Sequence, residues 1–75
     1  MTLNEIVSVQ PDVMHGTPVF AGTRVPIQAL LDHLEAGDSL DDFLDDFPSV
    51  TREQAVKFIN LSGRQAVEDI VARSA

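Results

Sequence analysis

The sequence predicts a mainly α-helical protein in which a short N-terminal β region precedes a three-helix, homeodomain-like helix-turn-helix unit. Apolar residues recur at helical spacing in three successive stretches after residue 26, which predicts amphipathic helices. The preceding segment holds short β-branched runs broken by Gly and Pro, which indicates strands and turns. With 75 residues, the chain is long enough for one domain. We therefore expect a single domain over 1–75, divided into a β and turn segment (1–25) and a three-helix unit (26–75).

Two short strands are expected in the N-terminal segment. Residues 6–9 carry three β-branched apolar side chains, residues 18–20 form a second candidate strand, and a turn follows at residues 21–23. Gly16 and Gly22 are expected to adopt backbone angles that a side chain would disfavour. Because strands this short are unstable alone, we expect them to pair with a neighbouring sheet edge, which a second copy of the chain could supply.

The first two helices have clear boundaries in the sequence. Pro26 suits the first turn of a helix, and Gly37 is expected to end that helix in a left-handed conformation. Ser39 can cap the second helix, and Pro48 should stop it, because the residue before a proline avoids the α region. The stripes predicted to face the core are Ile27, Leu30, Leu31 and Leu34 in the first helix, and Leu40, Phe43, Leu44 and Phe47 in the second.

The third helix is expected to start with a capping box formed by Thr51 and Gln54. Its apolar residues extend from Ala55 to Val71, with Gly63 in the middle. Glycine inside a helix costs about 1 kcal/mol relative to alanine, so the sequence leaves open whether the helix runs on through this position or breaks or bends there. A short second helix, a tight connection and a longer third helix are typical of a helix-turn-helix unit.

One stretch of the chain resembles the signature of a prokaryotic family, domain of unknown function 433. The stretch covers residues 13–26 and ends in Gly22-Thr23-Arg24-Val25-Pro26. Weaker similarities follow at residues 36–40 and 46–48, and Ala21 is a departure, since relatives often carry Lys or Arg there. The family looks like antitoxins of the VapB kind, which are partners of PIN-like ribonuclease toxins. The resemblance therefore implies the antitoxin of a type II toxin–antitoxin pair, which binds and neutralises such a ribonuclease.

The net charge bears on the choice of partner. The chain carries 12 acidic and 5 basic residues, a net charge of −7, which should repel bare nucleic acid and attract a basic protein. As an antitoxin it would cover either a basic RNA-binding surface or the acidic, metal-binding mouth of the toxin. Two alternatives stay open. One is a helix-turn-helix DNA-binding transcriptional regulator, whose affinity for promoter DNA would be weak alone. The other is a dimeric adaptor that binds another protein.

Two groups of residues are candidate contact sites. The partner-binding candidates are Arg24, Asp41, Asp42, Asp45 and Asp46; the nucleic-acid-binding candidates are Arg52, Lys57, Asn60 and Arg64. Arg and Asn have the chemistry to read guanine and adenine edges. Both groups could instead be ordinary solvated helix faces, the second supported by an ion pair between Glu53 and Lys57. Arg24 could anchor an acidic residue within the fold or contact a partner, because arginine suits both roles.

Catalysis is not expected. The chain has no Cys, its two histidines (His15 and His33) lack ligand spacing, and neither a phosphate-binding glycine loop nor a nucleophile beside a base is present. We therefore expect no enzyme activity, no cofactor and no metal. No signal sequence or membrane span is recognisable, so the protein is expected in the cytoplasm, without membrane contact. Because a domain of this size has a thin core, we also expect a homodimer or a higher homo-oligomer.

Overall fold

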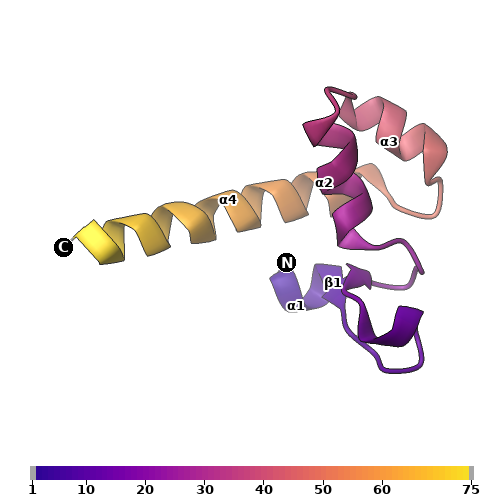
Figure 1. Ribbon diagram of the computed structural model, residues 1–75, viewed down its shortest axis with the longest axis horizontal. Coiled ribbons are helices and arrows are strands. Elements are labelled where there is room, and N and C mark those ends of the chain that lie inside the picture. Colours follow the sequence, from indigo (N-terminus) through magenta and orange to yellow (C-terminus); the bar gives the residue numbers. More distant parts are fainter. Residues whose placement is uncertain (1, 75) are drawn as a thin grey trace.

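The computed structural model describes residues 2–74 and shows a small body from which one long helix projects (Figure 1). The mainly α fold with a short N-terminal β region is confirmed. The elements in chain order are α1 (Leu3–Ile6), β1 (Val7–Ser8), the 3-10 helix η1 (Met14–Gly16), β2 (Val19–Phe20), α2 (Ile27–Glu35), α3 (Leu40–Asp46) and α4 (Arg52–Ser74). The molecule measures 41 × 30 × 21 Å. None of the helices in the described part of the chain is long and apolar enough to cross a membrane.

The two strands pair with each other in antiparallel orientation. Val7 lies opposite Phe20, and Ser8 lies opposite Val19. Each strand therefore has the neighbouring edge that it was expected to need, and because one chain supplies both strands, this pairing requires no second copy. The predicted start of the first strand was also wrong, because Ile6 ends the short helix α1 and is 1% exposed. Its carbonyl accepts a 2.7 Å hydrogen bond from the backbone N–H of Ala21, which extends the pairing.

Helices α2 and α3 begin and end close to the predicted positions. Pro26 precedes α2, and Gly37 has a φ of 85°, as expected for a left-handed cap. Ser39 and Asp42 form a capping box at the start of α3, with two 3.1 Å hydrogen bonds between side chain and backbone. The predicted core stripe of α2 is only half correct. Its first two apolar residues are buried, whereas Leu31 and Leu34 are exposed.

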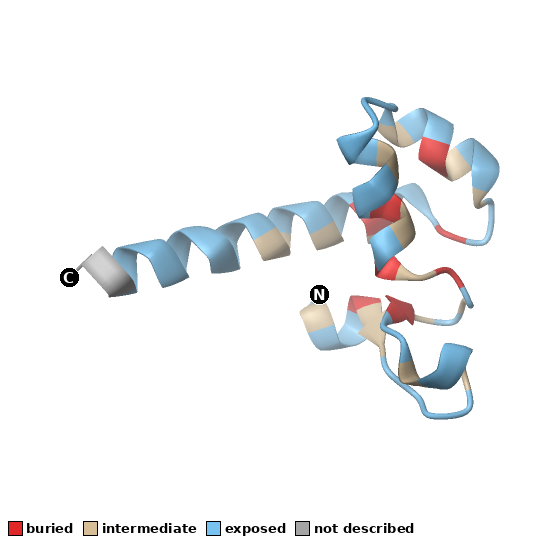
Figure 2. Cartoon of the chain, in the orientation of Figure 1, coloured by how far each residue is buried: buried red, intermediate tan, exposed pale blue. Residues whose placement is uncertain are grey.

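Helix α4 begins with the predicted capping box, in which Gln54 and Thr51 bond each other through side chain and backbone. The helix then runs without a break through Gly63 to its last described residue, which settles the question that the sequence left open. Only the first part of α4 packs on the body: Ala55 is fully buried, while Phe58 and Leu61 are partly buried. Every residue from 63 to 72 is exposed (Figure 2).

The core draws on α1, β2, α2, α3 and the first part of α4, together with the connections that follow β2 and α3. Phe20 of β2 lies at its centre, with its ring centroid 6.0 Å from that of Phe43 in α3 and 6.0 Å from that of Phe58 in α4. Such aromatic pairs contribute beyond the area they bury. The buried cluster consists of Ile6, Phe20, Val25, Ile27, Leu30, Phe43, Val50 and Ala55. The core thus fixes the turn after β2 against both α3 and the start of α4.

Candidate functional site

The turn after β2 is built by residues of the Gly-Thr-Arg-Val-Pro sequence, each with its own structural reason. Gly22 has a φ of 76°, which favours glycine. The Oγ1 of Thr23 donates a 2.8 Å hydrogen bond to the Phe20 carbonyl and accepts a 3.0 Å bond from the Val25 N–H. The Phe20 N–H in turn donates to the Val25 carbonyl at 3.0 Å. The turn is therefore closed by both backbone and side-chain bonds.

The last residues of this sequence lead into α2. Val25 is buried in the core, and Pro26 forms a bridge with Val19 and precedes the first residue of the helix. Arg24 differs from its neighbours, because its side chain is exposed. Among residues with described side chains (2–72), no carboxylate forms an ion pair with it. Arg24 was expected either to anchor an acidic residue within the fold or to contact a partner. The described structure gives no support to the first of these roles.

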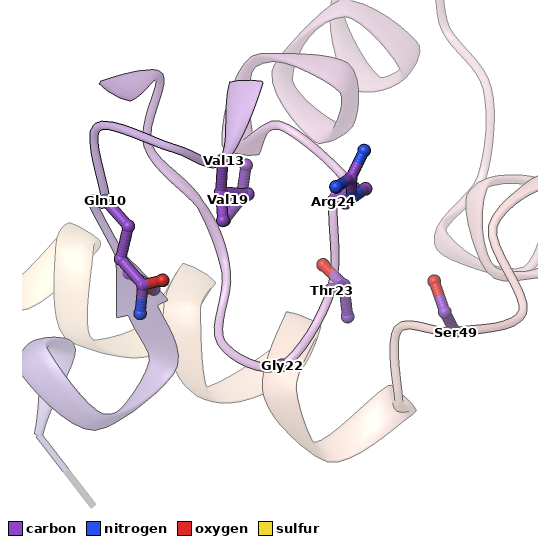
Figure 3. A pocket seen from close by; sticks show the side chains of 8 residues that line it. Gln10, Val13, Val19, Gly22, Thr23, Arg24 and Ser49 are labelled. Atoms are coloured by element: carbon purple, nitrogen blue, oxygen red, sulfur yellow. The ribbon is translucent and has the colours of Figure 1, made fainter. Parts of the chain in front are cut away.

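Arg24 borders an open cleft of about 460 Å³ (Figure 3). We call it the signature cleft; it is lined by Ser8, Gln10, Val13, Val19, Gly22, Thr23, Arg24 and Ser49. Figure 3 shows Arg24 and Thr23 on the turn, with Ser49 beside them on the connection between α3 and α4. The cleft therefore brings together segments that are distant in sequence, and Arg24 supplies its charge.

A second candidate surface covers the end of α2 and all of α3. We call it the acidic corner; its carboxylates are Asp32, Glu35, Asp38, Asp41, Asp42, Asp45 and Asp46, and all are exposed. No Lys or Arg occurs between Val25 and Thr51, so the sequence places no neutralising cation within this segment. The four aspartates predicted as partner-binding residues all belong to this surface and leave the Phe43 side of α3 to the core.

Several of these aspartates have partners within the chain. Asp41 forms an ion pair with Arg52, and Asp42 accepts a hydrogen bond in the cap of α3. Asp46 contacts His33, with Oδ2 3.5 Å from Nε2. Among the described side chains, Asp45 forms no hydrogen bond or ion pair, and the same holds for Glu35. These two carboxylates are therefore the ones most available to a partner.

His33 joins α2 to α3. Its ring lies edge-on to Phe43 and Phe47, with centroid distances of 5.5 and 5.8 Å. Its Nδ1 lies 3.2 Å from a carboxylate oxygen of Asp38, but without hydrogen-bond geometry. Because a carboxylate lies beside each ring nitrogen, the imidazole sits between Asp38 and Asp46. Asp38 and Asp46 therefore both have a contact within the fold, which gives these two carboxylates of the acidic corner a structural role.

The nucleic-acid-binding candidates do not form one free surface. Arg52 forms an ion pair with Asp41. This pair neutralises one residue of each predicted site. Lys57, Asn60 and Arg64 are exposed and share one side of α4, since they follow a spacing of three and four residues. The expected ion pair between Lys57 and Glu53 is not among those formed within residues 2–72.

Sequence reasoning missed one residue that holds the site together. The Nε2 of Gln54 donates a 2.9 Å hydrogen bond to the carbonyl of Ala21, which lies in the turn after β2. The capping pattern identified Gln54 only as a partner of Thr51. The side chain of a glutamine has both an oxygen acceptor and an NH₂ donor. The cap uses only the oxygen, so the unused NH₂ group was the one sign in the sequence that Gln54 bonds elsewhere.

The fold and part of the sequence have known relatives. A crystal structure of a DUF433 member protein from Anabaena variabilis has a TM-score of 0.63; the likeness covers 92% of this chain and 71% of that chain, and at 22% identity it shows the fold alone. The uncharacterized protein y4eO of Sinorhizobium fredii is 42% identical over 50 residues, which are 67% of this chain but only 23% of that longer protein. The family model described as "Protein of unknown function (DUF433)" matches residues 7–60, which include β1, the signature cleft, α2, α3 and the start of α4. The chain belongs to the DUF433 family.

Proposed function

We propose that this protein is an antitoxin, which binds and neutralises a PIN-like ribonuclease toxin in the cytoplasm. The observation that carries the proposal is the acidic corner, a group of seven exposed carboxylates at the end of α2, in the α2–α3 connection and on α3. A surface that binds RNA is basic, because it must neutralise phosphates. The acidic corner therefore has the charge needed to cover such a surface, and covering it would exclude the RNA.

The distribution of charge supports this partner. The first 51 residues contain nine acidic residues and a single Lys or Arg, Arg24. A field of one sign raises the rate at which an oppositely charged protein associates, and it selects against partners of the same sign. Glu35 and Asp45 can meet a partner without losing an internal contact, whereas Asp41 and Asp42 serve the fold.

Arg24 offers a second and different contact. Its neighbours in the turn are committed to the backbone or the core, while Arg24 itself is exposed at the rim of the signature cleft. Arginine binds carboxylates with paired hydrogen bonds. In the proposed complex, Arg24 contacts an acidic group of the toxin, such as one at its metal-binding mouth, while the acidic corner covers basic residues.

The test is inhibition of the ribonuclease encoded in the adjacent reading frame. Purified nuclease is assayed on RNA with increasing amounts of this protein, and inhibition near equimolar ratio is expected. The double variant Glu35→Gln with Asp45→Asn should slow association at low salt, as measured by stopped flow. The control, Glu5→Gln with Asp12→Asn, changes the net charge equally but on exposed residues far along the sequence from α3.

Two results would contradict the proposal. One is full nuclease activity in the presence of excess protein; the other is an adjacent frame that encodes no nuclease. If both double variants slow association equally, the acidic corner is only part of a general field, and the contact must lie elsewhere. The difference between the variants should diminish as salt screens the charges beyond about 8 Å at physiological ionic strength.

A DNA-binding regulator is the second candidate. In this interpretation α2, α3 and α4 form a homeodomain-like helix-turn-helix unit, and Lys57, Asn60 and Arg64 lie on the exposed side of the recognition helix. Against it, Arg52 is already paired with Asp41, and the aspartates of α3 oppose phosphate. We expect weak binding of promoter DNA by the protein alone. A dissociation constant of about 10⁻⁸ M or tighter would favour the regulator.

A further inference from the structure

The end of α4 presents an apolar surface that the described part of the chain leaves uncovered. All residues from 63 to 72 are exposed, and the helix extends away from the body over this length (Figures 1 and 2). Val67, Ile70 and Val71 are 60%, 62% and 62% exposed. A single exposed Val or Ile is ordinary, but several on one projecting helix indicate a contact surface.

Two of these residues, Val67 and Ile70, belong to one stripe along α4. Val56, Ile59, Gly63, Val67 and Ile70 recur at steps of three and four, so they share one face of the helix. A shallow groove of about 520 Å³ follows the middle of the stripe; it is lined by Ile59, Asn60, Gly63, Arg64, Val67 and Glu68. A Cβ placed on Gly63 would meet nothing within 4 Å, so this position is open.

The projecting part of α4 lacks the packing that stabilises most helices. Helices shorter than about 12–15 residues are marginal in water, and tertiary contact with an amphipathic face provides most of their stability. Gly63 adds a cost of about 1 kcal/mol relative to alanine. Both facts indicate that the stripe is covered when the helix is fully formed.

We infer that the stripe binds the same stripe of a second copy, with the two α4 helices antiparallel. The net charge of −7 comes entirely from residues 1–60, because residues 61–75 hold Arg64, Arg73, Glu68 and Asp69 and are neutral in sum. Two acidic bodies repel each other, whereas the projecting parts can meet without net repulsion. An antiparallel pair also places the two bodies at opposite ends.

The charges beside the stripe specify the direction of the pair. Arg64 and Glu68 lie one turn apart along the same edge of the stripe. In an antiparallel pair with two-fold symmetry, Arg64 lies opposite Glu68 of the partner subunit, and the reverse contact is equal. In a parallel pair the two copies of this edge would lie on opposite sides of the interface, so Arg64 and Glu68 would not face each other. The two charges of this edge are therefore complementary to each other in the antiparallel arrangement, which brings the two copies of the edge together.

The apolar residues fit the same register. With the two-fold axis near Val67, Gly63 lies opposite Ile70 of the partner subunit, so a branched side chain meets the open groove. A contact between two such segments is smaller than a standard interface of about 800 Å² per partner, so micromolar affinity is expected. This pairing is independent of the toxin proposed above, since it uses neither Arg24 nor the acidic corner.

Sedimentation equilibrium tests whether the stripe pairs. The full chain should be dimeric at about 100 µM, and Ile70→Asp should raise the dimer dissociation constant by about tenfold or more. Gln65→Asp is the matched control, since it adds the same charge on the opposite side of the helix and should remain dimeric. Circular dichroism of both variants verifies that the body is folded. A monomeric parent chain at this concentration would overturn the inference.

Cysteine substitution tests the direction, because the chain has no cysteine of its own. Val67→Cys lies near the two-fold axis and should form a disulfide between copies. Val56→Cys should not, since its two copies would lie about 30 Å apart along the helices, beyond the reach of about 7 Å between Cα atoms. Crosslinking at residue 56 would show a parallel pair and overturn the register. The charge reversals Arg64→Glu and Glu68→Arg should each weaken the dimer, and the double reversal should restore it.

Discussion

The side-chain Nε2 of Gln54, in the first turn of α4, donates a 2.9 Å hydrogen bond to the carbonyl oxygen of Ala21, in the turn after β2. The two residues are 33 positions apart, so this bond ties the N-terminal segment to the last helix. The same side chain accepts the Thr51 N–H through its Oε1. One glutamine therefore caps a helix and positions the turn that carries Arg24.

Gln54→Glu should separate these two tasks. The carboxylate can still accept the Thr51 N–H, but it cannot donate to Ala21, whose carbonyl is in a partly buried site. Loss of a partner for a buried acceptor costs about 1–3 kcal/mol, so we expect urea denaturation to show a loss in this range. Gln65→Glu is the control: it removes a donor to Asp69 at an exposed position, where the loss should be within about 0.5 kcal/mol. Equal losses in the two variants would contradict the role given to Gln54.

Thr23→Val should destabilise the protein although the two side chains have nearly the same shape. The hydroxyl both donates to the Phe20 carbonyl and accepts the Val25 N–H, so valine leaves the latter donor without its acceptor. The expected cost in the free energy of unfolding is about 1–3 kcal/mol. Thr17→Val, at an exposed position, should have little effect. If the two variants melt at the same temperature, the hydroxyl of Thr23 is not needed for the turn.

Phe43→Ala should remove most of the stability of the body. Phe43 is fully buried and contacts Phe20, Phe47 and His33 with ring centroids 5.0–6.0 Å apart. Truncation of a buried phenylalanine costs about 3–5 kcal/mol, which is a large part of the stability of a small domain. Leu34→Ala should be far milder, because Leu34 is 40% exposed. Near-native circular dichroism and an unchanged melting temperature for Phe43→Ala would contradict this packing.

Gly63→Ala should strengthen the projecting part of α4. The measurement is made in the Ile70→Asp background, so that helix pairing does not contribute. Alanine favours the helix by about 1 kcal/mol, and its Cβ meets no neighbouring atom. Amide exchange in residues 61–71 should slow by about fivefold, as this free energy implies. Exchange that stays the same would mean that this part of α4 is already stable by itself.

The sequence was most informative where the interactions are local. The cap at Ser39, the capping box at Thr51 and the left-handed Gly37 depend on residues within a few positions, and each formed as predicted; the reciprocal bond from Asp42 at the Ser39 cap was not predicted. The mutual pairing of the two strands was missed because β-propensity does not specify a partner. The course of the helix at Gly63 stayed open in the sequence for a similar reason, since a propensity cost of about 1 kcal/mol lowers helix stability without forcing a break.

The candidate sites depended on long-range contacts that no pattern could give. Arg52 and Asp41 were assigned to different sites, and the fold pairs them across 11 positions. The exposure of Arg24 could be argued only after the hydrogen bonds of Thr23 and the burial of Val25 were known. The charge of the acidic corner was clear from the sequence, but which carboxylates are free was not.

The ten exposed residues at positions 63–72 also bear on how long the protein survives in a cell. Proteases cut chains that open locally, and the regions that open most easily are those with few buried contacts. Cleavage within residues 63–72 would leave all eight members of the buried core cluster in the remaining fragment, since the last of them is Ala55. An unpaired copy would then be trimmed to a folded body that can no longer pair, while a paired copy would be protected. The rate of degradation would thus depend on the concentration of the protein. It would rise at low concentration, because a larger fraction of the copies would then be unpaired.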